Sequence, residues 1–416
     1  MGSKDAVIIG YDAISPLGSD LDVQWTRALA GKSGIGPLTR FPLADDFPVR
    51  IAGQVPDIDD EKYPFLSARH QASWSSPVFK YGMLSVARAL ERSGIAITPD
   101  ISPRTAVTYS SAIGGLDSVL DADRRMRAEN KLPHPYVNPN SCINMVGGKI
   151  AIQTGARGPI TTTVSACATG LTSILIGALF LAQNRADVVI CGAVDFALVE
   201  PIVAGFYTMN GVYIPQEGRE NDPPETASRP FSTNRRGFVL SEGAGAVILA
   251  TREFAGAHGL RYNSELAGWS MTSDAHHFVA PNFATVKQCI LGAIADAGLT
   301  PGDIAVVNAH AASTRIGDKV EYDALRAVFT DLLPPVSANK SLIGHAMGAS
   351  SVIETIFALR GMQENLLPPT INYTADPEID IDCVAEGKRP LKQEFILKNS
   401  FGFGGCNACA VFKKSA

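Results

Sequence analysis

The sequence predicts an α/β fold, and three observations support this prediction. Short apolar segments that end at glycine or polar residues alternate along the chain with longer segments of helical periodicity. Strands that alternate with helices predict parallel sheets covered by helices on both faces. The order of strands and helices is similar before and after the polar segment 252–263, which indicates two related halves.

The expected elements of the first half begin with an apolar strand that ends at Gly10. Asp20 is a suitable N-cap for the helix that follows, and Gly31 is a suitable residue to end it. Polar or proline-rich segments are expected to form loops at 33–75, 131–141 and 215–236. Strands are expected at 6–9, 105–109, 187–192 and 245–251, and helices at 20–30, 78–92, 143–153 and 171–182.

The second half repeats the alternation of apolar strands and periodic helices. The polar segment 252–263, with its central Gly-Ala-His-Gly, is the best internal boundary in the chain. Strands are expected at 265–270, 304–308, 394–398 and 409–412, and helices at 284–297, 318–329 and 347–363.

Composition and charge exclude several classes of protein. The 416 residues are 46% hydrophobic and 19% charged, which is ordinary for a large globular fold. The formal net charge of -5 gives no reason to expect nucleic acid or an anionic membrane as a partner. The most apolar window, 171–182, is too short to span a membrane. Seven cysteines suggest no disulfide framework, so we expect a cytoplasmic protein.

A single cysteine stands where a β-branched segment meets an apolar one. Residues 159–164 predict a strand, Cys167 a sharp turn, and 171–182 a buried helix. We expect the pKa of this thiol to be lowered, because a helix N-terminus favours the thiolate. Its small neighbours would let main-chain N–H groups stabilise an oxyanion. These features favour a nucleophile, although a buried and inert cysteine is a common alternative.

Two further motifs place histidines beside apolar segments. Segment 306–318 puts His310 at the end of a buried strand, where open α/β sheets place their sites. Segment 339–349 contains Lys340, and two glycines bracket His345 near the start of a helix. Taken singly, a core histidine bonded to the backbone and a solvated surface lysine are the more common alternatives.

A last motif, 399–407, combines phenylalanines with glycines, as suits a mobile apolar gate. It is a poor dinucleotide site, because no helix can follow it so near the C-terminus. Cys406 and Cys409 form a C-x-x-C, but no second cysteine pair supplies the other ligands of a zinc site. The adjacent His276 and His277 lack a further ligand at metal-binding spacing. The sequence therefore predicts no metal centre at these motifs.

Together these motifs resemble the β-ketoacyl-acyl-carrier-protein synthases, the ketosynthase branch of the thiolase superfamily, and most nearly the type II elongating enzymes. The resemblance covers nearly the whole chain, including segments 7–10, 15–18, 110–115, 228–231 and 237–245. It implies a thiolase-like fold in which two similar halves form a five-layered αβαβα arrangement. The half with the nucleophilic cysteine would cover residues 1–255, and the half with both histidines would cover 256–416.

The resemblance implies a decarboxylative Claisen condensation in fatty-acid or polyketide or polyene biosynthesis. In such enzymes the residue matching Cys167 takes an acyl group from a carrier-protein thioester. Those matching His310 and His345 polarise the malonyl thioester carbonyl and stabilise the enolate. Lys340 is expected to hold charge near the second histidine and to pair with Glu354.

Other residues are expected to shape the substrate path. The resemblance implies that backbone N–H groups of Cys167 and Phe403 form the oxyanion hole and that the Phe403 side chain is a gate. Ile113 matches a position that lines the acyl pocket, and Thr314 one that touches the pantetheine arm. No bound cofactor is expected, because the substrates are carried on the phosphopantetheine of acyl-carrier protein. Some relatives hold a monovalent cation, and Asn308, Glu321 and Glu354 could contribute to such a site here.

The sequence departs from the family pattern in three places. Ala311 and Ala312 replace the usual glycine and threonine after the first histidine, and Cys406 replaces a threonine. Lys398 stands where relatives often carry a small residue. The missing threonine at 312 favours a specialised pathway, such as polyketide or polyene elongation, over ordinary fatty-acid synthesis.

Two alternatives remain beside an active condensing enzyme. The first is a non-catalytic subunit that sets chain length in a heterodimer, against which a cysteine rather than a glutamine at position 167 weighs. The second is a degradative thiolase that acts on coenzyme A and uses Cys406 or Cys409 as a base. The family also implies a homodimer or a heterodimer with a related chain, and the apolar strand 187–192 is compatible with such an interface.

Overall fold

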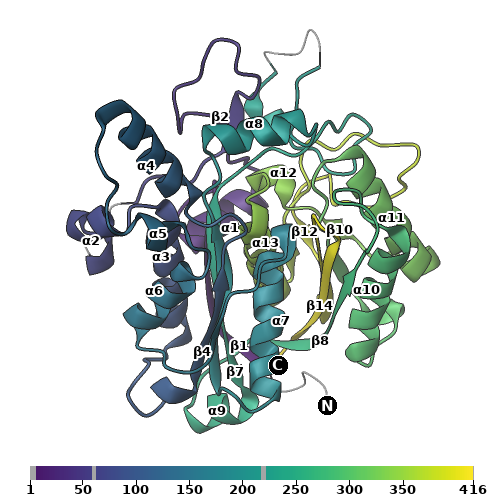
Figure 1. Ribbon diagram of the computed structural model, residues 1–416. Helices are drawn as coiled ribbons and strands as arrows, with labels where there is room; N and C mark the ends of the chain where they lie inside the picture. The colour runs from purple at the N-terminus through teal and green to yellow at the C-terminus, as the bar shows by residue number, and fades with distance from the viewer. Residues whose placement is uncertain (1–5, 59–61, 217–221, 416) are drawn as a thin grey trace.

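The computed structural model describes residues 6–58, 62–216 and 222–415, and its main feature is a ten-stranded sheet (Figure 1). The sheet consists of two sections of five strands that meet where β1 pairs with β8. The first section contains β1 (Ala6–Ile14), β4 (Thr105–Ser110), β5 (Ile160–Thr161), β6 (Val188–Asp195) and β7 (Gly243–Thr251). The second contains β8 (Ser264–Ser273), β9 (Val306–Asn308), β10 (Val336–Ser337), β13 (Phe395–Gly402) and β14 (Cys406–Lys414).

The two sections have the same strand order, β5-β4-β6-β7-β1 and β10-β9-β13-β14-β8. In each, the outer three strands pair in parallel and the remaining pairs are antiparallel. The prediction of parallel sheets therefore holds only for the outer three strands of each section. One cause is that residues 403–405 join β13 to β14 without room for a crossover helix. The repeated order supports two related halves, whose division after residue 255 stays a prediction.

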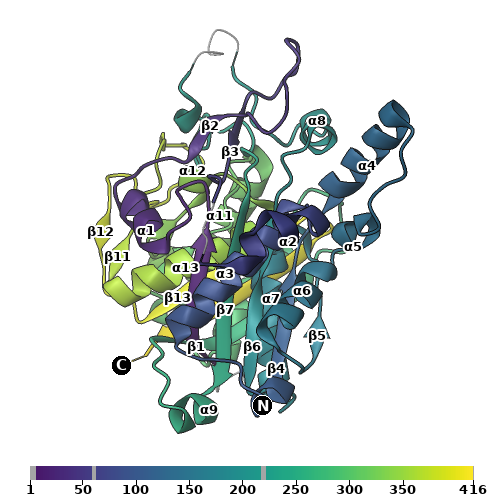
Figure 2. The same cartoon turned by 90° about the vertical axis from the view of Figure 1, so that its left-hand side faces the viewer.

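Helices and sheet sections form the predicted five layers (Figures 1 and 2). Helices α3 and α6 pack on the outer face of the first section, and α10 and α11 pack on that of the second. Helices α7 and α13 lie between the sections and supply much of the largest apolar core. The bounds are α3 (Pro77–Ser93), α6 (Met145–Thr154), α7 (Thr169–Ala182), α10 (Phe283–Asp296), α11 (Arg315–Phe329) and α13 (Met347–Glu364).

The two central helices approach each other closely near their N-termini. A Cβ added at Gly170 would lie 2.8 Å from the Cβ of Val352, and one added at Gly348 would lie 2.7 Å from a side chain of α7. Only glycine permits this contact without a shift of the neighbouring helix. Cys167 and His345 precede these helices, so the packing brings the two residues to the same end of the central layer.

Several helices were not predicted from the sequence, among them α4 (Leu116–Glu129), α5 (Val137–Ser141) and α8 (Glu200–Thr208). Helix α4 buries only the side chain of Ser118, so its sequence carries no apolar stripe. Ion pairs one turn apart, such as Arg127 with Asp123, stabilise it instead. The predicted strand before Cys167 shortens to the two residues of β5.

The remaining elements are short. Asp20 caps α1, since its side chain accepts two backbone N–H groups at 2.9 Å, as predicted. Part of the predicted loop 215–236, residues 217–221, lies outside the described residues. Among the described residues, no helix has both the length and the apolar content to cross a bilayer. The bounds are α1 (Leu21–Leu29), β2 (Ile35–Pro37), β3 (Ile51–Gly53), α2 (Ala68–Ser73), α9 (Arg252–Ala257), α12 (Lys340–Ile343), β11 (Leu366–Leu367) and β12 (Arg389–Pro390).

Candidate active site

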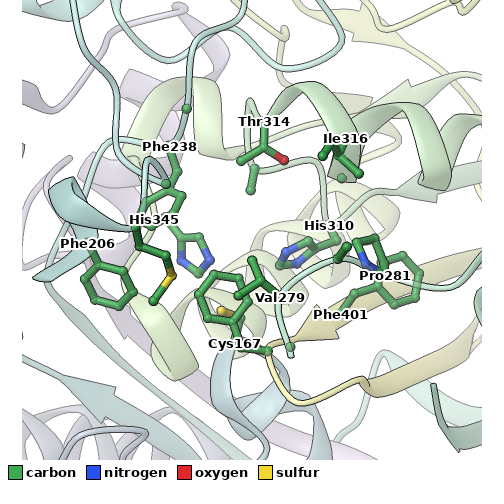
Figure 3. A pocket seen from close by; sticks show the side chains of 18 of the residues that line it. Cys167, Phe206, Phe238, Val279, Pro281, His310, Thr314, Ile316, His345 and Phe401 are labelled. Carbon is green, nitrogen blue, oxygen red and sulfur yellow. The ribbon is translucent and has the colours of Figure 1, made fainter. Parts of the chain in front are cut away.

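A cavity of about 820 Å³ lies beside the residues that precede α7 and α13. Cys167, His310 and His345 line it together, although they come from three distant segments (Figure 3). Much of the remaining lining is apolar and aromatic, which suits an apolar ligand. This apolar lining includes Phe206, Phe238, Met347, Phe401 and Phe403.

Cys167 lies in a tight turn at the start of α7. Ala166 has a φ of 48°, a left-handed conformation that is uncommon for a residue with a Cβ. The hydroxyl of Thr169 holds the turn, because it donates to the Ala166 carbonyl at 2.7 Å and accepts the Ser165 N–H at 3.0 Å. Strained backbone of this kind persists where the surrounding contacts fix it, and it presents the thiol to the cavity.

Burial dominates the electrostatics of the Cys167 thiol. The residue is 4% exposed, and burial raises the pKa of Cys167 to about 12. The positive charge of Lys340 and the backbone N–H groups of Phe403 and Cys167 act in the opposite direction. The predicted lowering of this pKa is wrong for the resting site, because desolvation of the thiolate outweighs the favourable contacts. Cys167 therefore rests as a protonated thiol.

Two backbone N–H groups, those of Phe403 and Cys167, favour negative charge at the sulfur. Phe403 follows the last residue of β13, so the sheet carries its N–H to the cysteine turn. Gly402 permits this approach, because an added Cβ would lie 2.4 Å from the Ser165 carbonyl oxygen and 3.2 Å from the Cys167 nitrogen. Converging N–H groups are the arrangement that an oxyanion hole requires.

His345 presents a hydrogen-bond donor to the cavity. Its Nδ1 accepts the Met347 N–H at 3.1 Å and lies 3.1 Å from the Ser350 hydroxyl oxygen. The proton of the neutral ring therefore sits on Nε2. Burial, and next the charge of Lys340, lowers the pKa of His345 well below its usual value, so the ring is neutral at pH 7.

Hydrogen bonds to its backbone N–H and carbonyl groups hold His310 in place. Its N–H donates to Glu321 Oε1 at 2.9 Å, and its carbonyl accepts from Lys340 Nζ at 2.5 Å. Its ring packs edge-on against that of His345, with 5.7 Å between the ring centroids. Burial, and next the charge of Lys340, lowers the pKa of His310 well below its usual value. Its Nδ1 is buried and has no hydrogen-bond partner in the described parts of the chain.

A buried charge cluster lies behind His310. Lys340 and Glu354, which were predicted to pair, form an ion pair of 2.6 Å between Nζ and Oε1. Lys398 Nζ contacts the other carboxylate oxygen of Glu354 at 2.7 Å. All three side chains are at most 1% exposed, so Glu354 bridges two lysines in an environment that contains little water.

Comparisons with known proteins place this site in a family. The profile "Beta-ketoacyl synthase, N-terminal domain" matches residues 3–255, and "Beta-ketoacyl synthase, C-terminal domain" matches residues 263–374. The chain belongs to the β-ketoacyl synthase family. A 3-oxoacyl-[acyl-carrier-protein] synthase 2 of Coxiella burnetii is 34% identical, and the alignment covers 100% of this chain and 99% of the relative. The predicted family and the predicted class of condensing acyltransferases are confirmed.

Solved structures support the thiolase-like fold of this β-ketoacyl synthase. A β-ketoacyl synthase from Burkholderia phymatum STM815 superposes with a TM-score of 0.90 at 27% identity, covering 99% of this chain and 100% of that one. The ishigamide ketosynthase/chain length factor gives a TM-score of 0.89 at 26% identity, with the same coverage of both chains. The predicted fold class is confirmed.

The other predicted site residues lie at or beside the cavity. Thr314 and Phe403 line it, and the Phe403 ring centroid lies 6.5 Å from that of Phe206. Ile113 does not line this cavity but packs beside it, in an apolar cluster that includes Met347. The placement is compatible with a pantetheine contact, a gate and an acyl-pocket residue, and these roles stay predictions.

The oxygen ligands suggested for a monovalent cation are largely occupied by the protein in this family member. Both Glu354 oxygens accept from lysines, and the Glu321 oxygens accept two backbone N–H groups and an asparagine amide. Asn308 Oδ1 alone is buried without a partner in the described structure. The Lys398 ammonium already stands beside this set, so these residues do not fit an additional cation. Across the described residues there is no metal-binding cluster of histidine, cysteine and acidic side chains.

Sequence analysis missed two residues of this synthase. Asp195, at the carboxyl end of β6, accepts the N–H groups of Ala112, Ile113 and Ala349, so it ties the turn after β4 to the start of α13. The sequence could have indicated Asp195 as a site residue, because it lies at the end of a strand, where open α/β sheets place their sites. Phe238 packs edge-on against His345 at 5.3 Å between ring centroids, and no pattern in the sequence indicated this contact.

Proposed function

We propose that this β-ketoacyl synthase condenses an acyl chain bound to Cys167 with malonyl-acyl-carrier protein and releases β-ketoacyl-acyl-carrier protein and carbon dioxide. The observation that carries the proposal is the single cavity lined by a buried thiol and two neutral imidazoles. The backbone N–H groups beside the thiol supply the stabilisation that acyl transfer requires.

The first half-reaction is acyl transfer to Cys167. The sulfur attacks the thioester carbonyl of the acyl-carrier protein, and the N–H groups of Cys167 and Phe403 stabilise the oxyanion. The carbon–sulfur bond to the carrier then breaks, and the proton of the Cys167 thiol leaves with the carrier thiol. Because burial disfavours a free thiolate, charge develops only when the oxyanion hole can accept it.

The second half-reaction is decarboxylation and carbon–carbon bond formation. The carbonyl oxygen of the malonyl thioester accepts hydrogen bonds from the two imidazoles, the carboxylate leaves as carbon dioxide, and an enolate remains. The Nε2–H of His345 is one donor, and the neutral ring of His310 is the other. The enolate carbon attacks the acyl thioester, and the Cys167 sulfur departs and recovers a proton from solvent.

The substrate carrier is part of the proposal. The relative from Coxiella burnetii is named for acyl-carrier protein, and Thr314 at the cavity suits contact with a phosphopantetheine arm. The arm brings its thioester to Cys167, so the protein would need no bound cofactor of its own. Ala312 lines the same cavity where relatives carry a threonine, which leaves more apolar room and favours polyketide or polyene substrates. The cytoplasmic location expected from the sequence stays a prediction.

Neither alternative function is favoured by the site. A non-catalytic chain-length subunit has no need of a cysteine and two neutral histidines around one cavity. A thiolase would require a second thiol facing Cys167, and neither Cys406 nor Cys409 is among the residues that line the described cavity. Mass spectrometry of the products formed from acyl- and malonyl-carrier proteins tests the proposal. A β-ketoacyl-carrier product supports it, and acetyl-carrier protein as the only product would reject it.

Gly402→Ala is expected to slow acylation of Cys167 by roughly 10²–10³-fold, because this is the typical cost of losing one donor of an oxyanion hole. The added Cβ would meet the Ser165 carbonyl at 2.4 Å and displace the strand end that carries the Phe403 N–H. Single-turnover transfer from a labelled acyl-carrier protein measures this rate. Gly256→Ala is the control, since a Cβ there meets no atom within 4 Å. Equal rates for both variants would exclude the oxyanion role.

We also propose a dimer that forms through β5 rather than through strand 187–192. That predicted interface strand is β6, which lies inside the sheet between β4 and β7 and has no free edge. Strand β5 ends the sheet order, and Ile160 and the nearby Val164 are 50% and 44% exposed. An exposed apolar strand edge favours pairing with another chain. Light scattering is expected to give twice the chain mass, or a complex with a related chain, and a stable active monomer would reject the proposal.

A further inference from the structure

Lys398 is a buried lysine on β13 that the two half-reactions do not use directly. Its side chain is 0% exposed, and its Nζ donates to Glu354 Oε2 at 2.7 Å and to the Ala309 carbonyl at 3.5 Å. Burial lowers the pKa of Lys398, and the ion pair with Glu354 opposes this shift. A lysine is rarely buried without a compensating partner, so this position requires a physical explanation.

The charges around Lys398 balance. Glu354 and Glu321 contribute two buried carboxylates, and Lys340 and Lys398 contribute two buried ammonium groups. Glu321 accepts only N–H donors, as an ionised carboxylate does. The two cavity histidines add no charge, because burial lowers the pKa of each. If either lysine were absent, one carboxylate would remain buried without a counter-charge, which is strongly unfavourable.

The sheet register explains why the lysine reaches this cluster. Lys398 pairs with Asn308 across the parallel strands β13 and β9. Asn308 Oδ1 is the buried oxygen that has no partner in the described structure. A small side chain at position 398 would leave a space beside the two oxygen atoms that accept from the Lys398 ammonium, those of Glu354 and Ala309, with one negative charge in excess. Oxygen ligands and one excess negative charge suit a hard monovalent cation.

We propose that the Lys398 ammonium is a built-in monovalent cation, which makes this synthase independent of dissolved potassium or sodium ions. The ammonium neutralises Glu354 and thereby fixes Lys340, whose Nζ holds the His310 carbonyl. Lys398 is a positioning residue, since it acts through these groups and does not touch the reacting atoms. Only the activity readout of this inference depends on the proposed function, because ion binding and stability can be measured without it.

The wild-type protein provides the first test. Its condensation rate and melting temperature are expected to be equal in potassium, sodium and tetramethylammonium chloride at one ionic strength. A crystal grown in rubidium chloride is expected to show no anomalous density peak beside Glu354, because rubidium would meet the Lys398 ammonium at that position.

Two substitutions separate the charge of Lys398 from its volume. Lys398→Ala is expected to lose activity by roughly 10- to 100-fold in tetramethylammonium chloride, as is typical for residues that orient a site. Potassium is expected to restore its activity and melting temperature with saturation and to give a rubidium peak. Lys398→Met fills the space without charge, so its loss is expected to persist in every salt. Lys392→Ala removes an exposed lysine and is the control.

Each outcome bears on the proposal. Saturable dependence of the wild-type protein on potassium, or a rubidium peak beside Glu354 in it, would overturn the proposal. Full activity of Lys398→Ala in every salt would overturn the positioning role. If this variant does not fold, the wild-type titration and the rubidium map decide alone. If no variant condenses substrate but stability and rubidium binding behave as expected, the proposed function fails and the role of Lys398 as the cation stands.

Discussion

Cys167→Ala is expected to abolish condensation while decarboxylation of malonyl-carrier protein continues. The substitution removes the only thiol of the cavity lining described above, so no acyl-enzyme can form. Loss of a catalytic nucleophile lowers turnover by roughly 10⁴- to 10⁶-fold. His310 and His345 keep their places, because the contacts that hold them do not involve the cysteine side chain. The release of labelled carbon dioxide and the yield of β-ketoacyl product, measured in the same reaction, separate the two activities.

Cys142→Ala is the matched control for the nucleophile, since Cys142 is exposed and lies outside the cavity lining. This variant is expected to condense at the wild-type rate. Condensation by Cys167→Ala through another thiol would show that the nucleophile is assigned wrongly. Loss of decarboxylation together with condensation would show that the thiol also shapes the histidine site.

His345→Ala is expected to have a large effect on the other half-reaction. Decarboxylation is expected to fall by roughly 10²–10³-fold, because one of the two donors to the developing enolate is lost. Acylation of Cys167 is expected to change little, since it depends on the oxyanion hole. Because burial lowers the pKa of His345, wild-type decarboxylation is expected to stay level as the pH falls through the usual histidine range near 6.5.

Single-turnover acylation and carbon dioxide release, followed for both proteins between pH 8 and about pH 5.5, measure these effects. His70→Ala removes an exposed histidine of α2 and is the control. An equal loss of both half-reactions in His345→Ala would indicate that the ring has a structural role. A fall of wild-type decarboxylation centred near 6.5 would contradict the lowered pKa.

The sequence sufficed to predict the motifs, the layers and the family. Apolar segments such as 245–251 and 306–308 are buried strands. Their apolar character can be seen in the sequence without knowledge of distant contacts. Cys167, His310 and His345 each follow or precede such a segment, which is why they could be singled out. The longest helix that the sequence did not reveal is α4, which has little apolar pattern and whose ion pairs lie on an exposed surface.

Other features depend on three-dimensional contacts that no local pattern records. The raised pKa of Cys167 follows from its burial, whereas the turn and helix alone suggested a lowered one. Strand 187–192 is apolar because it is central in the sheet, and not because it meets a partner. Lys398 could be noted as unusual in the sequence, but its partner Glu354 lies 44 residues away and only the fold brings them together.

The most direct test of the central claim is mass spectrometry of the Cys167 peptide through one catalytic cycle. Incubation with an acyl-carrier protein is expected to add one acyl group to this peptide and to no other cysteine peptide. Addition of malonyl-carrier protein is then expected to remove the group and to yield an equal amount of β-ketoacyl-carrier protein. An acyl group that stays on Cys167 after malonyl-carrier protein is consumed, or a product that forms while the peptide is never acylated, would contradict the account.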